Sequence, residues 1–166
     1  MRILAIGNNP VRDITPISRL TNLEDLLIHG LKISDLKPIE NLNNLTYLFA
    51  AGNEISDISP LAKLENLKSL NLYFNKISDI SALRNLTNLN ELYLSCNSIS
   101  DISSLSGLVN LTDLHLSENK ITDISALREL VNLKSLTLSD NPITDYSPIR
   151  DIYQQLEHKD MDIYFP

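Results

Sequence analysis

Several kinds of residue are scarce in this sequence of 166 residues, and each scarcity excludes a class of protein or site. The single cysteine, Cys96, excludes an internal disulfide and a zinc site built from several cysteines. Basic residues are outnumbered, since 14 Lys and Arg stand against 21 Asp and Glu, for a net charge of −7. A nucleic-acid-binding protein normally carries a basic patch, so this balance argues against nucleic acid as a partner. No apolar run approaches the roughly 20 residues that a membrane-spanning helix needs.

Leucine, isoleucine and asparagine are, by contrast, abundant, with 31, 19 and 18 copies, and they recur every 22 residues. One series of positions holds leucine throughout, a second holds aspartate throughout, and a third holds asparagine except at Leu31. The three series are Leu4, Leu26, Leu48, Leu70, Leu92, Leu114 and Leu136; Asp13, Asp35, Asp57, Asp79, Asp101, Asp123 and Asp145; and Asn9, Asn53, Asn75, Asn97, Asn119 and Asn141. The chain therefore contains seven copies of one 22-residue unit.

Each unit combines the pattern of a short strand with that of a tight helical turn. In residues 67–88, Leu70 and Leu72 alternate with polar residues, which is typical of a strand with one buried face. Further along, Ile77 and Ile80 begin a run of apolar residues three apart, which suits a helical turn. One unit cannot bury its own apolar face, but stacked units can. The sequence therefore predicts a parallel sheet opposite a wall of turns, with strands around residues 3–6, 25–28, 47–50, 69–72, 91–94, 113–116 and 135–138.

The two polar series have structural explanations. Each asparagine follows a strand, where its amide can donate to and accept from backbone groups of its own and adjacent units. Each aspartate precedes a return turn and can accept hydrogen bonds from free N–H groups there, as we expect of Asp57, Asp79, Asp101 and Asp123. Stacked carboxylates also suggest calcium, but calcium needs six to eight oxygens around one ion, and one capping aspartate per layer supplies too few. We therefore expect the protein to need no metal.

One unit departs from the pattern at two positions. Leu31 replaces the asparagine, and in the next unit Ala50 replaces a core leucine. Both should point inward in adjacent layers, so we hypothesise that Leu31 fills the volume vacated at Ala50; two unrelated neutral changes are the alternative. A double-mutant cycle with Leu31→Asn and Ala50→Leu separates the two, because additive effects would exclude coupling.

The pattern LxxLxLxxNxIxDIxxLxxLxN resembles that of leucine-rich-repeat proteins, specifically the 22-residue subclass of bacterial internalins and eukaryotic phosphatase-regulatory proteins. The resemblance covers residues 1–154. It implies an α/β fold: a right-handed solenoid with a parallel sheet on its concave side and short 3₁₀ or helical return segments on its convex side. It also implies binding of other macromolecules on the concave side, with no catalysis and no cofactor. An internalin-like protein would lie on a bacterial surface or be secreted, whereas a phosphatase-regulatory-like protein would be cytoplasmic.

The two ends of the predicted solenoid differ. Apolar residues at helical spacing predict a capping helix from about residue 147 to 158, and a last short strand is expected near residues 161–164; residues 155–166 thus end the C-terminal cap. At the other end Met1 already occupies a core position, which leaves the strand at 3–6 uncovered. Open strand edges pair with other chains. We expect this edge to be covered by further repeats of a longer protein or, alternatively, by self-association.

Residues suited to catalysis are few. Asp113, His115 and Ser117 alternate along one predicted strand and superficially suggest a hydrolytic triad. Residues two apart on a strand lie about 6.8 Å apart with parallel side chains, whereas a working triad needs hydrogen bonds of about 2.6–3.2 Å. The three histidines are too scattered for a zinc site. We therefore expect no enzyme activity.

The solvent-facing side of the predicted sheet, which we call the sheet face, carries aromatic residues that the repeat does not require. Five of the chain's aromatic residues lie there, in the third to fifth units, and towards the C-terminal units the face becomes acidic. An exposed aromatic patch usually marks an interaction site. The predicted partner-binding residues are Leu27, Tyr47, Phe49, Tyr73, Phe74, Glu91, Tyr93, Asp113 and His115.

Three functions fit this sheet face. The first, which we favour, is a non-enzymatic module that binds a protein partner with a basic rim. The second is carbohydrate binding, because tyrosine and phenylalanine rings also stack on sugars. The third is a spacer domain of a larger surface protein, whose aromatic residues only stabilise the sheet by stacking across strands.

Overall fold

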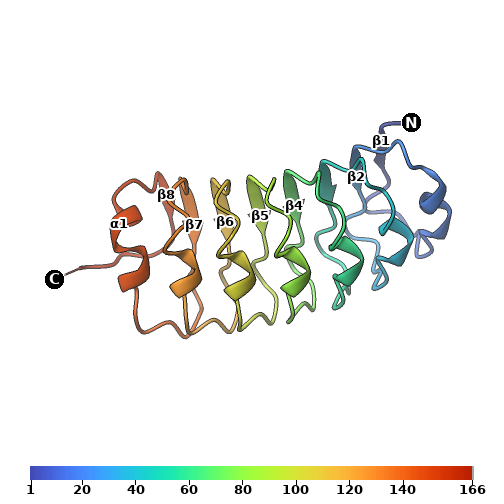
Figure 1. Ribbon diagram of the computed structural model, residues 1–166. Helices are drawn as coiled ribbons and strands as arrows, with labels where there is room; N and C mark the ends of the chain where they lie inside the picture. Colours follow the sequence, from blue (N-terminus) through green and yellow to red (C-terminus); the bar gives the residue numbers. More distant parts are fainter. Residues whose placement is uncertain (166) are drawn as a thin grey trace.

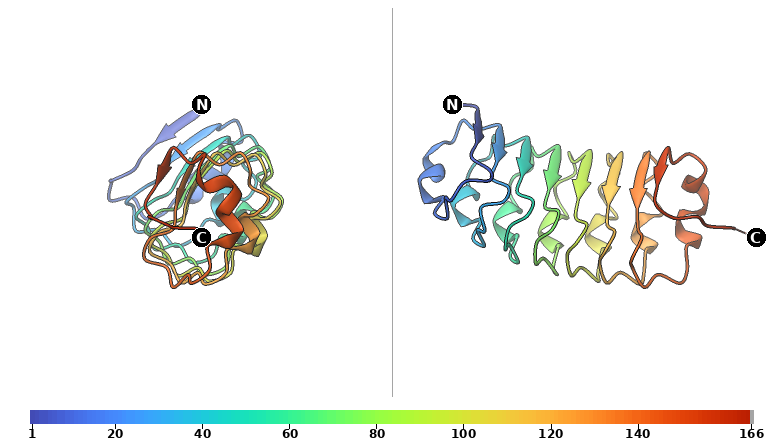
Figure 2. Two further views of the ribbon diagram at one scale, coloured as in Figure 1. Left: turned by 90° about the vertical axis from the view of Figure 1, so that its left-hand side faces the viewer. Right: turned by 180° about the vertical axis from the view of Figure 1, so that it is seen from behind.

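The computed structural model describes residues 1–165 and shows a solenoid in which each 22-residue unit contributes one strand and one short helical turn (Figure 1). The strands are β1 (Ile3–Ala5), β2 (Asp25–Leu27), β3 (Tyr47–Phe49), β4 (Ser69–Asn71), β5 (Glu91–Tyr93), β6 (Asp113–His115), β7 (Ser135–Thr137) and β8 (His158–Lys159). The turns are the 3₁₀ segments η1 (Thr15–Arg19), η2 (Lys37–Ile39), η3 (Ser59–Leu61), η4 (Ser81–Leu83), η5 (Ser103–Leu105), η6 (Ser125–Leu127) and η7 (Ser147–Ile149), with helix α1 (Arg150–Tyr153) after the last. The two termini lie at opposite ends of the stack (Figures 1 and 2).

The predicted parallel sheet is confirmed. Over residues 1–165, eight strands pair in the order β1 to β8, and up to β7 successive strands pair at an offset of 22 residues, as Ile3 does with Asp25. The first seven strands begin at the predicted residues and end one residue earlier than predicted. The middle residue of β2 to β7, such as Leu26 or Leu70, is a fully buried leucine of one continuous core. Its neighbours on either side therefore project to the sheet face.

The asparagine series forms a hydrogen-bonded ladder along the solenoid, as predicted. In Asn97, Nδ2 donates to the backbone oxygens of Leu94, at 3.0 Å, and of Leu72 in the preceding unit, at 3.1 Å. Its Oδ1 accepts from the N–H of Ile77 at 2.9 Å. The same arrangement recurs at Asn53, Asn75, Asn119 and Asn141. Each of these side chains therefore ties two successive units together.

The ladder accommodates the leucine at position 31. The Leu31 side chain is buried, and its N–H donates to Oδ1 of Asn53 in the next unit at 3.0 Å. The following residue, Lys32, has a φ of 60°, which none of the equivalent residues in the other units shows among residues 1–165. Ala50 is also fully buried. Both residues of the hypothesised volume exchange thus lie in the core, and their coupling stays a prediction for the double-mutant cycle.

A second series of amides, which the sequence analysis did not identify, links the units at the segments that precede the strands. Nδ2 of Asn66 donates to the backbone oxygen of Asn43 in the preceding unit at 2.7 Å. In the cap, Gln155 takes this place and donates to the backbone oxygen of Val131 at 2.6 Å. The other members are Asn44, Asn88, Asn110 and Asn132. The 22-residue spacing of these asparagines is the feature of the sequence that indicates their shared role.

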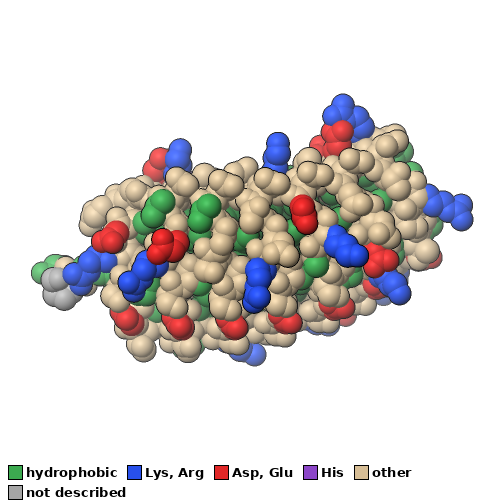
Figure 3. All heavy atoms as spheres, viewed as in Figure 1, with side chains coloured by type: hydrophobic (Ala, Val, Ile, Leu, Met, Phe, Trp, Pro, Cys, Tyr) green, Lys and Arg blue, Asp and Glu red, His purple; other side chains and the backbone are tan. Residues whose placement is uncertain are grey.

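The aspartate series binds the return turns as predicted. Oδ1 of Asp57, Asp79, Asp101 and Asp123 accepts the backbone N–H two residues further along, at 2.8 Å in each case. Acidic side chains accordingly repeat along one margin of the solenoid (Figure 3). Hydrogen bonding to the serine two residues further along, mainly to its backbone N–H, lowers the pKa of Asp57, Asp79, Asp101 and Asp145. Burial opposes this lowering at all four, and so does the charge of the next aspartate at Asp57 and Asp79.

We expect these carboxylates to make the stability of the protein sensitive to acid. Because their pKa values are lower in the folded than in the unfolded chain, their contribution is complete above the ordinary aspartate pKa of about 3.9. It is lost as the pH falls through the lower, folded values. The urea midpoint of unfolding should therefore decrease between about pH 5 and pH 2, and less so in Asp79→Asn. A midpoint that rises on acidification would mean that repulsion along the series outweighs the hydrogen bonds.

The C-terminal cap differs from the prediction in two respects. Helical structure begins at Ser147 as predicted, but α1 ends at Tyr153 rather than near residue 158. The predicted strand at residues 161–164 is wrong, because the last strand is β8 (His158–Lys159). This strand pairs with β7 at an offset of 23 residues, so the cap contains one residue more than a repeat between paired positions.

Asp160 explains why strand pairing ends at β8. In the repeats, an N–H such as that of Leu116 donates to the backbone oxygen of the next strand. The equivalent N–H of Leu138 donates instead to the Asp160 carboxylate at 2.8 Å. The same carboxylate accepts the N–H of Ser139 at 3.1 Å and the hydroxyl of Ser117 at 2.7 Å. Burial opposes the charge, but these hydrogen bonds hold the pKa of Asp160 below its ordinary value. The carboxylate thus closes the end of the sheet.

The N-terminal edge is open in the described residues. Strand β1 has one neighbouring strand, β2, and the side chains of Met1 and Ile3 are 72% and 62% exposed. An ion pair between Arg2 and Glu24 links the first two units at this end.

We expect hydrogen exchange to be fastest in the first repeat and slowest in the fourth to sixth. Repeats contact only their neighbours, so a terminal unit with one neighbour opens at lower free energy. Exchange measured peptide by peptide tests this. Strong protection of residues 3–6 would contradict it and indicate an edge covered by another copy of the chain.

Candidate functional site

Two rows of side chains cross the sheet face, one on each side of the buried leucines. The opening residues of successive strands form the first row, which includes Asp25, Tyr47, Ser69, Glu91 and Asp113. The closing residues form the second row, which includes Leu27, Phe49, Asn71, Tyr93 and His115. The strands thus bring seven of the nine predicted binding residues onto one surface, and the other two, Tyr73 and Phe74, follow β4.

The five predicted aromatic residues differ in exposure. Tyr47, Phe49 and Tyr93 are half-buried, whereas Tyr73 and Phe74 are 46% and 62% exposed. The first three therefore offer part of a ring to a partner, and the last two offer most of theirs.

Four of the five rings form separate pairs rather than one continuous stack, and within residues 1–165 Tyr47 takes part in none. Phe49 stacks on His29, with ring centroids 4.5 Å apart and planes inclined by 26°. Tyr93 lies against His115 at 4.8 Å, and Tyr73 lies 6.1 Å from Phe74. Stacking contributes about 0.5–1.5 kcal/mol for each of the first two pairs, whereas the wider, solvent-exposed Tyr73–Phe74 pair contributes little. The aromatic residues therefore stabilise the sheet, as the spacer hypothesis expects, and still leave surface for a partner.

His29 belongs to this surface although the predicted set omits it. Its ring lies over Gly7, where a Cβ atom would come within 2.2 Å of the imidazole. Nε2 lies 3.1 Å from Nδ2 of Asn8, and within residues 1–165 the buried Nδ1 has no hydrogen-bond partner. Gly7 precedes His29 by one repeat. The glycine, which leaves room for the imidazole ring, is therefore the feature of the sequence that indicates this contact.

Phe74 has an unfavourable backbone conformation for a bulky residue. Its φ is 53°, in the left-handed region. The equivalent residues share this conformation and are mostly small or short polar ones: Asn8, Gly30, Gly52, Cys96, Glu118 and Asp140. Glycine adopts it freely and asparagine readily, whereas other side chains incur a cost of about 1 kcal/mol or more. Gly30 and Gly52, which lie 44 and 22 residues before Phe74, are the signal in the sequence for this left-handed position.

The acidic residues of the sheet face lack basic partners. The Ser69 hydroxyl donates to Glu91 Oε2 at 2.7 Å, and the Thr112 hydroxyl donates to Asp113 Oδ2 at 2.7 Å. Both rows are free of Lys and Arg from β1 to β7. The two ion pairs found within residues 1–165, Arg2–Glu24 and Lys76–Glu54, involve neither row.

The triad-like residues hydrogen-bond to other groups rather than to one another within residues 1–165. His115 Nε2 lies 3.2 Å from the Ser135 hydroxyl, while the Ser117 hydroxyl donates to Asp160. Burial lowers the pKa of His115, although the nearby charges of Asp113 and Asp160 oppose this. The arrangement at these positions is that of a sheet surface.

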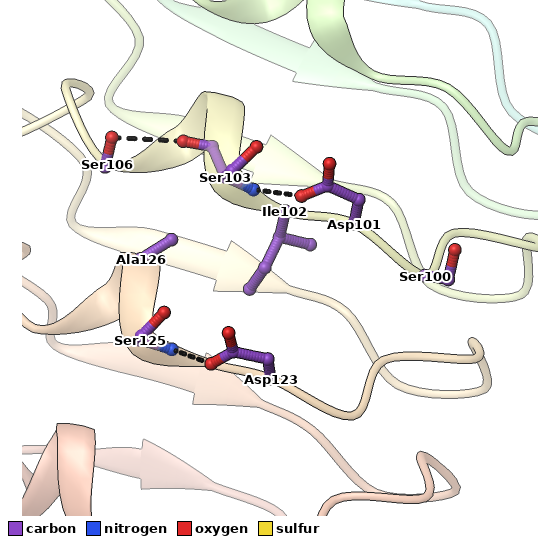
Figure 4. Close-up of a pocket in the computed structure, with 8 residues that line it drawn as sticks. All are labelled: Ser100, Asp101, Ile102, Ser103, Ser106, Asp123, Ser125 and Ala126. Carbon is purple, nitrogen blue, oxygen red and sulfur yellow. Dashed lines mark hydrogen bonds between the residues drawn. The ribbon is translucent and has the colours of Figure 1, made fainter.

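The aspartates of the 22-residue series accept hydrogen bonds from their own return turns. A hollow of about 390 Å³ between η5 and η6 is lined by serines together with Asp101 and Asp123. Each carboxylate points to the backbone N–H of its own turn (Figure 4). No group of three or more His, Cys, Asp or Glu suited to a metal ion occurs within residues 1–165. Over the same residues, no helix has the length and apolar character that crossing a membrane requires.

Comparison with protein families identifies the repeat. The family model described as two copies of the leucine-rich repeat matches residues 21–63, 43–85 and 87–129, and the single-repeat model matches residues 132–151. The comparison with curated protein sequences gave no match.

Similar solved structures include two internalins. The structure of InlF, an internalin of Listeria monocytogenes, superposes on this chain with a TM-score of 0.88 and 33% sequence identity. The matched region covers 99% of this chain and 55% of the InlF chain. Internalin C2 of the same species is 36% identical with a TM-score of 0.78, covering 95% and 79%. A leucine-rich-repeat protein of Leptospira interrogans is 26% identical with a TM-score of 0.77, covering 95% and 48%. The chain thus spans about half the length of InlF. It belongs to the leucine-rich-repeat family and is an internalin-like member of it.

Proposed function

We propose that this chain is a non-enzymatic protein-binding module whose partner docks on the sheet face. Internalin-like leucine-rich-repeat proteins generally take part in protein–protein interactions. The proposed anchors are Tyr47, Phe49, Tyr73, Phe74 and Tyr93, with Leu27, Glu91, Asp113 and His115 around them.

The observation that carries the proposal is Phe74. A phenyl group that is 62% exposed gains little from burial in this chain, and its backbone is held in a conformation that costs stability. Residues of this kind concentrate at ligand-binding sites, where the strain serves function. An aromatic ring buried by a partner contributes about 2 kcal/mol or more as an interface anchor, which exceeds the backbone cost.

Phe74→Asn is therefore expected to raise stability and to abolish partner retention. Asparagine tolerates the left-handed conformation, so the free energy of unfolding should rise by about 0.5–1 kcal/mol. We expect one extracellular or cytoplasmic protein to be captured stoichiometrically by the immobilised wild-type chain and lost from the variant. Thermal unfolding and quantitative mass spectrometry measure the two effects.

Val109→Asn is the matched control for this experiment. Val109 is a 44% exposed apolar residue outside both rows of the sheet face. The control should retain the captured protein as well as the wild type does. Equal retention by Phe74→Asn would contradict the proposed surface, and a glycan array that gave specific signals abolished by Phe74→Asn would support carbohydrate binding instead.

A further inference from the structure

The carboxylate of Glu91, which opens β5, lies over the neighbouring strand β4 on the sheet face. Its Oε2 accepts a hydrogen bond from the hydroxyl of Ser69. Ser69 lies on β4, between Glu91 and Tyr47 in the first row. The side chain therefore reaches back from β5 over β4. Ser69 and Asn71, the two outward residues of β4, are both short. They leave the carboxylate beside the two larger residues, Tyr47 on β3 and Tyr93 on β5.

Tyr47 on β3 and Tyr93 on β5 belong to the two strands that flank β4, over which this carboxylate reaches. Their strands are two sheet spacings apart, which is about 10 Å. Burial raises the pKa of both hydroxyls, and the charge of Glu91 raises the pKa of each further. Aromatic rings attract a cation to their faces. Two rings and one carboxylate thus form surroundings that favour a flat positive group.

The described part of the chain, residues 1–165, supplies no such group at this place. Glu91 pairs directly with Asp113 on the neighbouring strand, and like charges opposite each other destabilise a sheet. Within residues 1–165, neither carboxylate takes part in an ion pair. A cation brought by a partner would offset this repulsion and bind the rings at the same time.

We propose that the partner protein inserts an arginine side chain between Tyr47 and Tyr93 and binds Glu91 through its guanidinium group. Arginine fits better than lysine because its planar, weakly hydrated group stacks on rings and donates in a fork to a carboxylate. This inference rests on the proposed function and names the chemistry of the partner at the centre of the two rows.

The test uses N-acetyl-arginine amide as the probe, titrated into the full ¹⁵N-labelled chain. N-acetyl-citrulline amide, which has nearly the same shape without the charge, is the matched probe. Arginine should give saturable shifts in the millimolar range at the amides of Tyr47, Ser69 and Glu91, and citrulline should give none there. Glu91→Gln should weaken the arginine response at least about tenfold, whereas Glu65→Gln, an exposed position outside both rows, should leave it unchanged.

Each contrary outcome has a distinct meaning. An equal response to citrulline or to N-acetyl-lysine amide, an unaffected Glu91→Gln, or shifts elsewhere on the chain would overturn the arginine site. Saturable shifts at Tyr47 and Tyr93 from methyl glycosides, with none from arginine, would overturn it in favour of a sugar. If the arginine site fails while Phe74→Asn still loses the captured protein, only this inference falls and the docking surface stands.

Discussion

Replacing Phe49 and Tyr93 together by alanine is expected to weaken partner binding at least about 30-fold, or about 2 kcal/mol. Both rings are half-buried in the free chain, so a partner can complete their burial. The change also removes the stacking on His29 and His115, which we expect to lower stability by about 1–3 kcal/mol in total. Titration calorimetry measures the affinity, and circular dichroism verifies that the solenoid remains folded.

The control for this prediction changes the opposite side of the molecule. Lys63→Ala and Arg84→Ala alter exposed residues outside both rows of the sheet face and should leave the affinity unchanged. If this pair weakened binding and the aromatic pair did not, the partner would dock on the turn side and the sheet face would be the wrong surface.

Asn97→Ala is expected to destabilise the protein by about 1–3 kcal/mol, because removing this side chain leaves one buried N–H group without a partner and weakens the hydrogen bonding of two backbone oxygens. The variant would leave the N–H of Ile77 without its acceptor and would loosen two units at once. The backbone oxygens of Leu72 and Leu94 would each lose one of two amide donors and keep the other, from Asn75 and Asn119. Urea denaturation monitored by circular dichroism gives the change in the free energy of unfolding.

The matched control is Asn43→Ala. Asn43 is exposed, and within residues 1–165 its side chain makes no hydrogen bond. We expect the free energy of unfolding to change by less than about 0.5 kcal/mol. Equal effects of the two substitutions would show that the ladder is not a principal source of stability.

The repeated part of the fold could be predicted because each residue type recurs with its structural role. The leucine at the middle of a strand and the asparagine after it are repeated six or seven times, so their pattern identifies strand position, register and hydrogen bonding together. The aspartates were predictable for the same reason. Features that occur only once in the chain, such as the C-terminal cap, have no repeated pattern from which to predict them. In the cap, the pairing is shifted by one residue and ends at Asp160, which replaces backbone acceptors, and a lone aspartate in a short tail does not indicate this.

The candidate site was predictable as a surface but not in its interactions. Alternation placed Tyr47, Phe49 and Tyr93 on one face, yet it could not reveal that Phe49 stacks on His29. That contact depends on the absence of a side chain at Gly7, one strand away. Likewise, the conformation of Phe74 follows from the turn geometry of its series and becomes evident only from the backbone angles.

Radical footprinting of the partner complex tests the central claim most directly, because it reports the solvent access of individual side chains and favours aromatic ones. Tyr73 and Phe74, the most exposed of the proposed anchors, should lose most of their reactivity when the partner binds, and Tyr47, Phe49 and Tyr93 should become unreactive. Val109 and Val131, which are exposed outside both rows, should react as in the free chain. Protection of the valines with unchanged reactivity of Tyr73 and Phe74 would contradict docking on the sheet face.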